Sequence, residues 1–158
     1  MNDFIATAGP SAGTGGIAAA FSKAVSLAGS IPDWALSLVA RIGVAGVFWR
    51  SGQTKVNGFE VTDSTYYLFR EEYKLPVIPP EIAAPLAAFA EHFFPALLII
   101  GFASRFSALA LLGMTLVIQL FVYPASWPDH AVWAAALLVI VARGPGFLSL
   151  DHLLFRRR

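Results

Sequence analysis

The sequence predicts an all-α integral membrane protein, a four-helix bundle with a short interfacial helix in its first external loop. Hydrophobic residues make up 57% of the 158 residues and charged residues 13%, about half the usual quarter. From Pro76 to Ala142 only four residues carry a formal charge: Glu81, Glu91, Arg105 and Asp129. Four long apolar stretches have the length that a membrane-spanning helix needs.

The same composition excludes several classes of protein. A soluble domain of this size needs more charged residues to cover its surface, which excludes a soluble enzyme. The net charge of +1 provides no basic field for nucleic acid. The chain has no cysteine, and therefore no disulfide and no thiolate chemistry. It also lacks a phosphate loop, a zinc-ligand spacing and a nucleophilic triad, so no metal ligands and no catalytic residues are assigned.

The chain divides into three parts: an N-terminal tail (1–31), a four-span membrane domain (32–152) and a basic C-terminal tail (153–158). Small and polar residues dominate the N-terminal tail and bury little apolar surface, so we expect it to be flexible or interfacial. Ile17 to Ile31 can form a weak surface helix. The tail lacks the basic start and apolar run of a secretory signal, and we expect it to be retained.

The first predicted span runs from Trp34 to Trp49 and continues past Arg50. Asp33 can cap its start, and a tryptophan at position 34 suits the membrane interface. The second span covers Ile82 to Phe102, which is about 30 Å of helix.

The third span covers Phe106 to Tyr123, an uncharged stretch of about 27 Å. The fourth runs from Pro128-Asp129 to Arg143, about 24 Å, which is short for a membrane. It ends at Gly144-Pro145-Gly146, a strong helix terminator.

The loop between the first two spans mixes aromatic and charged residues from Tyr66 to Tyr73. This pattern favours a short helix at the membrane interface. We interpret that helix as an anchor for the long loop, with a lid or partner-docking surface as the alternative.

The positive-inside rule sets the expected orientation. The side holding both termini carries six basic residues: Lys23, Arg105, Arg143, Arg156, Arg157 and Arg158. The other side carries four: Arg50, Lys55, Arg70 and Lys74. We therefore predict that both termini are cytoplasmic.

Charged residues within the spans carry the most information, because an unpaired charge near the bilayer centre costs several kcal/mol. Arg41 lies about 10 Å from the cytoplasmic boundary and Glu91 close to mid-membrane. Antiparallel packing predicts an Arg41–Glu91 ion pair, either a structural clamp or a proton or ligand site. Pro95 should kink the second span and free a carbonyl near Glu91.

His92 adjoins Glu91 and adds a third buried polar group. It can bind haem, donate to a quinone carbonyl or relay protons, or it can bond a neighbouring hydroxyl or backbone oxygen. A bis-histidine haem with His130 is excluded, because His130 lies about 15 Å nearer the outer face.

A second polar group near the outer face can form a cup for an anionic or carbonyl-bearing headgroup. Its residues are Arg50, Gln53, Lys55, Glu81, Gln119 and His130. The alternative is ordinary snorkelling of Arg50 and Lys55 at a helix end. Arg41 and Arg50 are nine residues apart and point about 180° apart on a straight helix, so they do not serve one site.

Several segments resemble the DoxX family. The end of the first span, Phe48-Trp49-Arg50-Ser51-Gly52-Gln53-Thr54-Lys55, resembles the end of that family's first helix. Ala90-Glu91-His92, followed by Pro95, Gly101 and Arg105, resembles its second helix and the turn into the third. Phe69 to Tyr73 and the segment from Arg143 to Asp151 look like the family's proteobacterial branch. A histidine often found near the end of the first span is Arg50 here.

The resemblance implies a small four-helix protein of the bacterial inner membrane, related to subunits of quinone-linked oxidoreductases and redox-homeostasis complexes. Other relatives assist the maturation of exported redox proteins or serve metal-stress responses. It implies no single reaction.

Two functional hypotheses follow. In the first, the chain is a membrane subunit that binds a quinone non-covalently and works with a redox partner that carries the electron centre. Glu91 and His92 would then handle protons, and Arg41 would set the charge of Glu91. In the second, it is a non-catalytic anchor or assembly factor for a partner protein. Homo-oligomerisation stays open.

Overall fold

The computed structural model describes residues 12–155, with side chains from residue 16 onward. The chain separates into two units, Met1–Pro32 and Asp33–Arg158. The first contains the exposed helix α1 (Ala12–Gly29), on the segment where a weak surface helix is predicted. The first eleven residues of the predicted N-terminal tail, 1–11, and the three terminal arginines, 156–158, lie outside the described residues.

The second unit holds the membrane domain. Its helices and strands, in chain order, are α2 (Asp33–Gln53), β1 (Val56–Asn57), β2 (Glu60–Val61), α3 (Asp63–Leu68), the π-helix η1 (Phe69–Tyr73), α4 (Pro80–Ile100), α5 (Ser104–Val117), the π-helix η2 (Ile118–Val122), the 3-10 helix η3 (Pro124–Ser126), α6 (Trp127–Arg143) and α7 (Leu150–Phe155).

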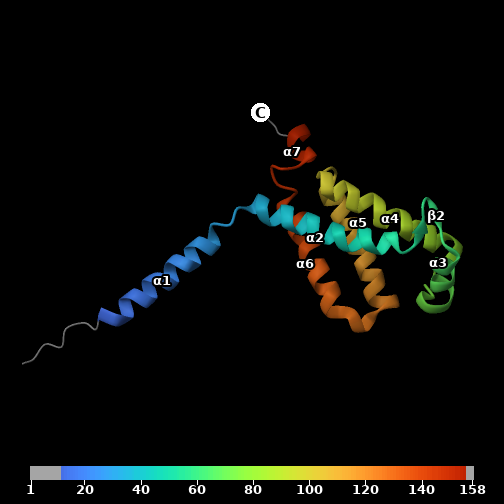
Figure 1. The fold of residues 1–158 in the computed structure, drawn as a ribbon, viewed down its shortest axis with the longest axis horizontal. Helices are drawn as coiled ribbons and strands as arrows, with labels where there is room; N and C mark the ends of the chain where they lie inside the picture. The colour runs from blue at the N-terminus through green and yellow to red at the C-terminus, as the bar shows by residue number, and fades with distance from the viewer. Residues whose placement is uncertain (1–11, 156–158) are drawn as a thin grey trace, which may run out of the picture. The chain divides into compact units, whose positions relative to one another are not determined.

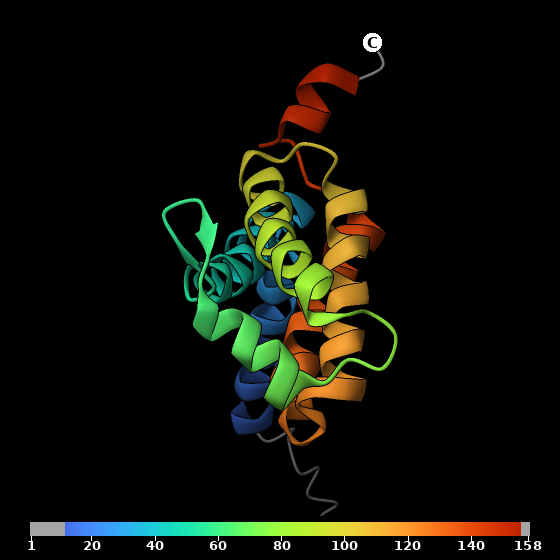
Figure 2. The same cartoon turned by 90° about the vertical axis from the view of Figure 1, so that its right-hand side faces the viewer.

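Four helices form a closed ring. Helix α2 packs against α4 and α6, and α5 packs against the same two helices from the other side. The hairpin and α3 lie at one end of α2, and α7 lies near its other end (Figures 1 and 2). The predicted all-α four-helix membrane bundle is therefore confirmed.

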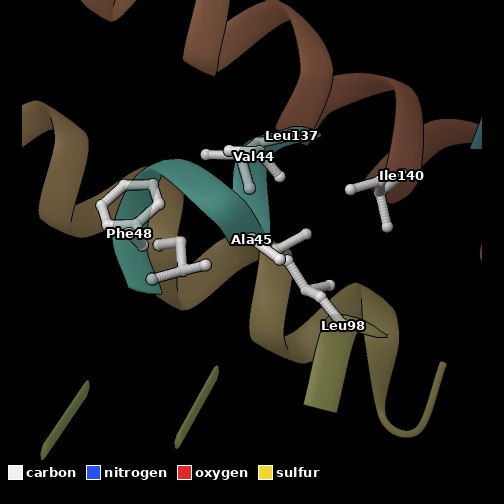
Figure 3. Close-up of a cluster of buried hydrophobic side chains, with 8 residues drawn as sticks. Val44, Ala45, Phe48, Leu98, Leu137 and Ile140 are labelled. Atoms are coloured by element: carbon white, nitrogen blue, oxygen red, sulfur yellow. The ribbon is translucent and has the colours of Figure 1, made fainter. Parts of the chain in front are cut away.

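The centre of the ring is filled by a small apolar cluster (Figure 3). Val44, Ala45 and Phe48 of α2 meet Leu137 and Ile140 of α6, and all five are nearly inaccessible. Leu98 of α4 and Ala108 and Leu111 of α5 complete the cluster. Each helix contributes its narrow apolar stripe to this core, so its remaining apolar side chains face outward.

The outer surface of the bundle is apolar, as a lipid-facing surface must be. Large exposed side chains include Ile42 on α2, Phe89 on α4, Leu116 on α5 and Val132 on α6. Three segments are long and apolar enough to span a membrane: Pro80–Ile100, Ser104–Val122 and Pro124–Arg143. Helices α1 and α2 meet the same length and hydropathy criteria only as a pair, which gives up to four candidate spans.

The boundaries of the helices follow the predicted signals. Helix α2 begins at Asp33, and α6 ends at Arg143 with Gly144 at a φ of 79°. The predicted short helix in the first loop is present, as α3 followed by η1 from Asp63 to Tyr73. Thr62 caps it by accepting a hydrogen bond from the backbone N–H of Thr65.

Arg41 closes the end of the bundle near α7. Arg41 is 1% exposed, and its guanidinium donates to four carbonyls. These belong to Leu98 (2.7 Å), Ile99 (2.9 Å), Pro145 (2.7 Å) and Leu148 (2.9 Å). The first two lie in the last turn of α4, where helix carbonyls attract a cation. Arg41 thus ties α4 to the segment that follows α6.

The same end is sealed by Asp151 of α7. Its carboxylate accepts hydrogen bonds from the N–H groups of Ala103 (2.8 Å) and Ser104 (2.9 Å) at the start of α5. Gly101 turns the chain between α4 and α5 with a φ of 72°, and a Cβ there would lie 2.8 Å from Nη2 of Arg41. Hydrogen bonds therefore satisfy the helix ends that meet here.

Candidate functional site

A buried ion pair joins α4 to Lys55, the second residue after the end of α2. Nζ of Lys55 lies 2.8 Å from Oε2 of Glu91, and the two side chains are 6% and 4% exposed. The ammonium also donates to Oγ of Ser51 at 3.0 Å. Apart from the ionic contact, this carboxylate oxygen has no hydrogen-bond partner among the described residues. One lysine therefore balances a carboxylate that the membrane would otherwise leave uncompensated.

The β-hairpin places Lys55 in this position. The Lys55 carbonyl accepts from the N–H of Thr62 (3.1 Å) and from the buried hydroxyl of Thr65 (3.0 Å). These bonds hold the backbone just past the last turn of α2. The side chain then folds back along that helix toward Ser51, four residues earlier.

The predicted Arg41–Glu91 ion pair is wrong. Arg41 lies opposite Leu98 and Ile99, whereas Glu91 lies opposite Gly52. Seven residues of α4 separate Glu91 from Leu98, about 10 Å along the helix. The two helices are antiparallel, as predicted, but the register between them is different. The prediction paired residues of α2 and α4 at similar depths in the membrane, whereas in the structure Arg41 lies about two helical turns along α4 from Glu91.

The Lys55–Glu91 pair borders an apolar cavity of about 240 Å³. Four helices and the first loop contribute to its walls. Apart from Ser51, Lys55, Glu91 and His130, the lining is aliphatic or aromatic: Val47, Phe48, Phe69, Tyr73, Leu75, Ile78, Ala83, Leu86, Ala87, Met114, Val117, Ile118, Val122, Tyr123 and Trp133. Both π-helices, η1 and η2, border the cavity, and π-helical turns are frequent at functional sites.

His130 of α6 provides a further polar side chain of the lining and is 4% exposed. Its Nδ1 lies 2.6 Å from Oε1 of Gln119. The ring packs against Trp133 with centroids 5.0 Å apart. A titratable imidazole is thus fixed on the α6 side of the cavity, while the ion pair comes from α2 and α4.

His92 belongs to a different surface. Its Nδ1 lies 2.7 Å from the carbonyl of Ala88, and its Nε2 lies 2.8 Å from the side-chain nitrogen of Gln53. The ring also contacts Trp49. Since His92 is not among the residues that line the cavity, the predicted Arg41, Glu91 and His92 do not form one site.

Gly52 sets how closely α2 and α4 approach at this level. A Cβ at position 52 would lie 2.8 Å from Cε1 of His92 and 3.2 Å from Cβ of Glu91. The Gly52→Ala variant is therefore expected to lose about 1–3 kcal/mol of unfolding free energy, because the two helices must move apart. Gly46→Ala is the matched control on the same helix, with open space around the new methyl group.

Chemical unfolding in detergent micelles, followed by circular dichroism, compares these two variants. Gly46→Ala is expected to be neutral or to gain up to about 1 kcal/mol from its better helix propensity. Equal stabilities of the two variants would contradict the close contact at Gly52.

The residues of the predicted outer cup do not form one site, because they lie in separate contacts. Lys55 and His130 line the cavity, whereas Gln53 bonds His92 and Gln119 bonds His130. Glu81 forms an exposed ion pair with Arg70 at 3.0 Å. Arg50 is exposed, in keeping with its separation from Arg41. Sequence reasoning placed the aromatic residues of η1 in an interfacial anchor and missed that Phe69 and Tyr73 line the cavity. It also missed the pairing of Lys55 with Glu91.

Tyr73 and Tyr123 meet at the rim of the cavity, with ring centroids 5.6 Å apart. The Tyr123 hydroxyl donates to Oε1 of Glu72 at 2.6 Å. This hydrogen bond, with some burial, raises the pKa of Tyr123 well above its usual value. The contact is complete at neutral pH and is lost at strongly alkaline pH, when the phenol ionises. It joins η1 to the end of η2 above the cavity.

These features define a multi-pass α-helical membrane protein whose bundle contains an apolar cavity bordered by a buried ion pair. The chain belongs to the DoxX family, whose model matches residues 36–124. That range runs from α2 to the start of η3 and includes Lys55 and Glu91, but not His130. The chain is also 30% identical, over 127 residues, to an uncharacterized protein of Haemophilus influenzae. The alignment covers 74% of this chain and 82% of that protein. No solved structure matches the chain.

Proposed function

We propose that this protein is a membrane subunit of a redox complex and that its cavity binds the ring of a quinone. The observation that carries the proposal is the apolar cavity bordered by the buried Lys55–Glu91 ion pair. Ligand sites commonly combine apolar walls with a few fixed polar groups. A charged pair kept at such a wall is a functional hypothesis by default in a membrane protein.

The dimensions and lining of the cavity fit a substituted ring. A cavity of about 150 Å³ holds benzene, so 240 Å³ accommodates a ring with several small substituents. Phe69 and Tyr73 provide aromatic surface for the ring. Leu86 and Val117 line the cavity and are also exposed on the outer face of the bundle. A lipid-soluble tail can therefore leave the cavity toward the membrane.

The polar residues have distinct roles in this proposal. Lys55 donates to a ring oxygen and balances the charge of Glu91, which replaces the role first expected of Arg41. Glu91 and His130 accept protons from the ring hydroxyl groups, and His130 takes the place of His92. A bound quinone would supply two-electron redox chemistry, with the electrons coming from a partner protein.

The location in the cell belongs to the same proposal. We place the protein in the bacterial inner membrane with both termini in the cytoplasm, because the side that carries the termini holds more basic residues. The cavity then lies in the outer half of the membrane, next to the loop that contains α3. The Arg41 cluster lies at the cytoplasmic end.

Ligand extraction tests the proposal. The protein is purified in mild detergent and extracted with organic solvent, and the extract is examined by absorbance and mass spectrometry. A quinone is expected in stoichiometric amount from the unaltered protein and at a small fraction of that amount from Glu91→Gln. His92→Ala is the matched control outside the cavity, and we expect it to retain the ligand.

Absence of quinone from the unaltered protein, together with a co-purifying partner that both variants retain, would contradict the proposal. That result would favour the non-catalytic anchor or assembly role instead.

A further inference from the structure

We infer that the cavity selects the reduced, dihydroxy form of its ring ligand over the corresponding dione, because Gln119 holds His130 as a hydrogen-bond acceptor. The inference rests on the proposed function and assigns the basis of its specificity. The contacts around Gln119 and His130 carry it.

The carbonyl of Pro124 fixes the orientation of Gln119. The side-chain nitrogen of Gln119 lies 2.9 Å from this carbonyl oxygen, which can only accept a hydrogen bond. The amide nitrogen must therefore face Pro124, and the amide oxygen must face His130. If the amide group were rotated by about 180°, its oxygen would face the carbonyl oxygen of Pro124, and no hydrogen bond could form there.

Gln119 in turn fixes the tautomer of His130. Nδ1 of His130 lies 2.6 Å from the Gln119 oxygen, so the proton of the neutral ring sits on Nδ1. Nε2 then carries a lone pair and acts as an acceptor. Among residues 16–155, whose side chains are described, the structure gives Nε2 no hydrogen-bond partner. His130 lines the cavity and Gln119 does not, and we assign this acceptor as the polar group through which His130 meets a ligand.

The ion pair does not discriminate between the two forms. Lys55 offers a donor to a carbonyl oxygen, and Glu91 offers an acceptor to a hydroxyl group. At His130 the two forms differ, because a hydroxyl donates to Nε2 whereas a carbonyl oxygen would face its lone pair. The diol therefore gains a hydrogen bond to Nε2, and it avoids the repulsion between the carbonyl oxygen of the dione and the Nε2 lone pair.

Calorimetric titration of the full chain in detergent, under anaerobic conditions, tests the inference. The probes are duroquinone and durohydroquinone, which share one small ring and have no tail. We expect durohydroquinone to bind about tenfold more tightly than duroquinone, the size of effect that one buried hydrogen bond provides. This comparison needs no variant, so a failure to fold cannot obscure it.

Two glutamine variants assign the selectivity to its cause. Gln119→Leu releases Nδ1, so the preference for the diol is expected to fall to about twofold or less while a ring still binds. Gln53→Leu is the matched control, because it removes the other glutamine–histidine contact outside the cavity, and its preference should be unchanged.

The outcomes separate the inference from the proposed function. Binding of the dione as tightly as the diol, or an equal change of preference in the two glutamine variants, overturns the inference and leaves the quinone site in place. Binding of neither probe overturns the quinone site as well.

Discussion

Replacing Arg41 with alanine is expected to lower the free energy of unfolding by about 3 kcal/mol or more. Four carbonyls from two separate segments converge on this guanidinium. Hydrogen bonds to a charged group contribute about 1.5–3 kcal/mol each, and the carbonyls would lose their shared donor inside the bundle. The segment from Pro145 to Asp151 should detach from α4 as a result.

Unfolding in mixed detergent micelles and limited proteolysis measure the two consequences of Arg41→Ala. We expect an earlier unfolding midpoint and faster cleavage within residues 145–155. Arg41→Lys should lie between the variant and the unaltered protein, because an ammonium lacks the planar fork of donors. Arg50→Ala, at an exposed arginine of the same helix, is the matched control with an expected change below about 0.5 kcal/mol. Similar losses in the Arg41 and Arg50 alanine variants would contradict the clamp.

Removing one member of the Lys55–Glu91 pair is the other large effect. Glu91→Leu leaves a buried ammonium with no counter-charge, and Lys55→Met leaves a buried carboxylate in the same state. Each single variant is expected to lose about 3–5 kcal/mol of unfolding free energy. The double variant has apolar groups of similar size at both positions, so its stability should return close to that of the unaltered protein.

The double-mutant comparison also separates stability from binding. Lys55→Met with Glu91→Leu should fold well and still fail to retain a quinone, because the polar wall of the cavity is gone. Arg70→Ala breaks the exposed Arg70–Glu81 pair and is the control, with an expected loss of about 1 kcal/mol at most. Additive losses in the double variant would show that the two side chains do not interact.

The spans could be predicted from local signals. Asp33 marks the start of α2 and Gly144 the end of α6, and the apolar stretches between such signals have the length of a membrane. The short helix of the first loop was also predictable, because aromatic and charged residues are mixed there, as they are in helices at a membrane interface. The ends of these helices are set by residues close to them in the sequence, so the local sequence pattern is enough to predict them.

The partners of the buried charges could not be predicted in the same way. The register of α2 against α4 depends on the contact of Gly52 with His92, and one glycine among several gave no sign of it. Lys55 looked like a helix-end residue whose charge reaches the lipid headgroups. The hairpin that turns it inward depends on Thr62 and Thr65, which contact its carbonyl only after the chain reverses.

Photolabelling with an azido-substituted quinone tests most directly whether the cavity binds a quinone ring. After illumination of the purified protein, peptide mass spectrometry locates the adduct. We predict adducts within residues 69–91, lost in Ala87→Phe, which fills the cavity, and retained in Ala135→Phe, which adds the same ring on the exposed face of α6. Labelling confined to the outer face of the bundle and unchanged by Ala87→Phe would contradict a quinone site in the cavity.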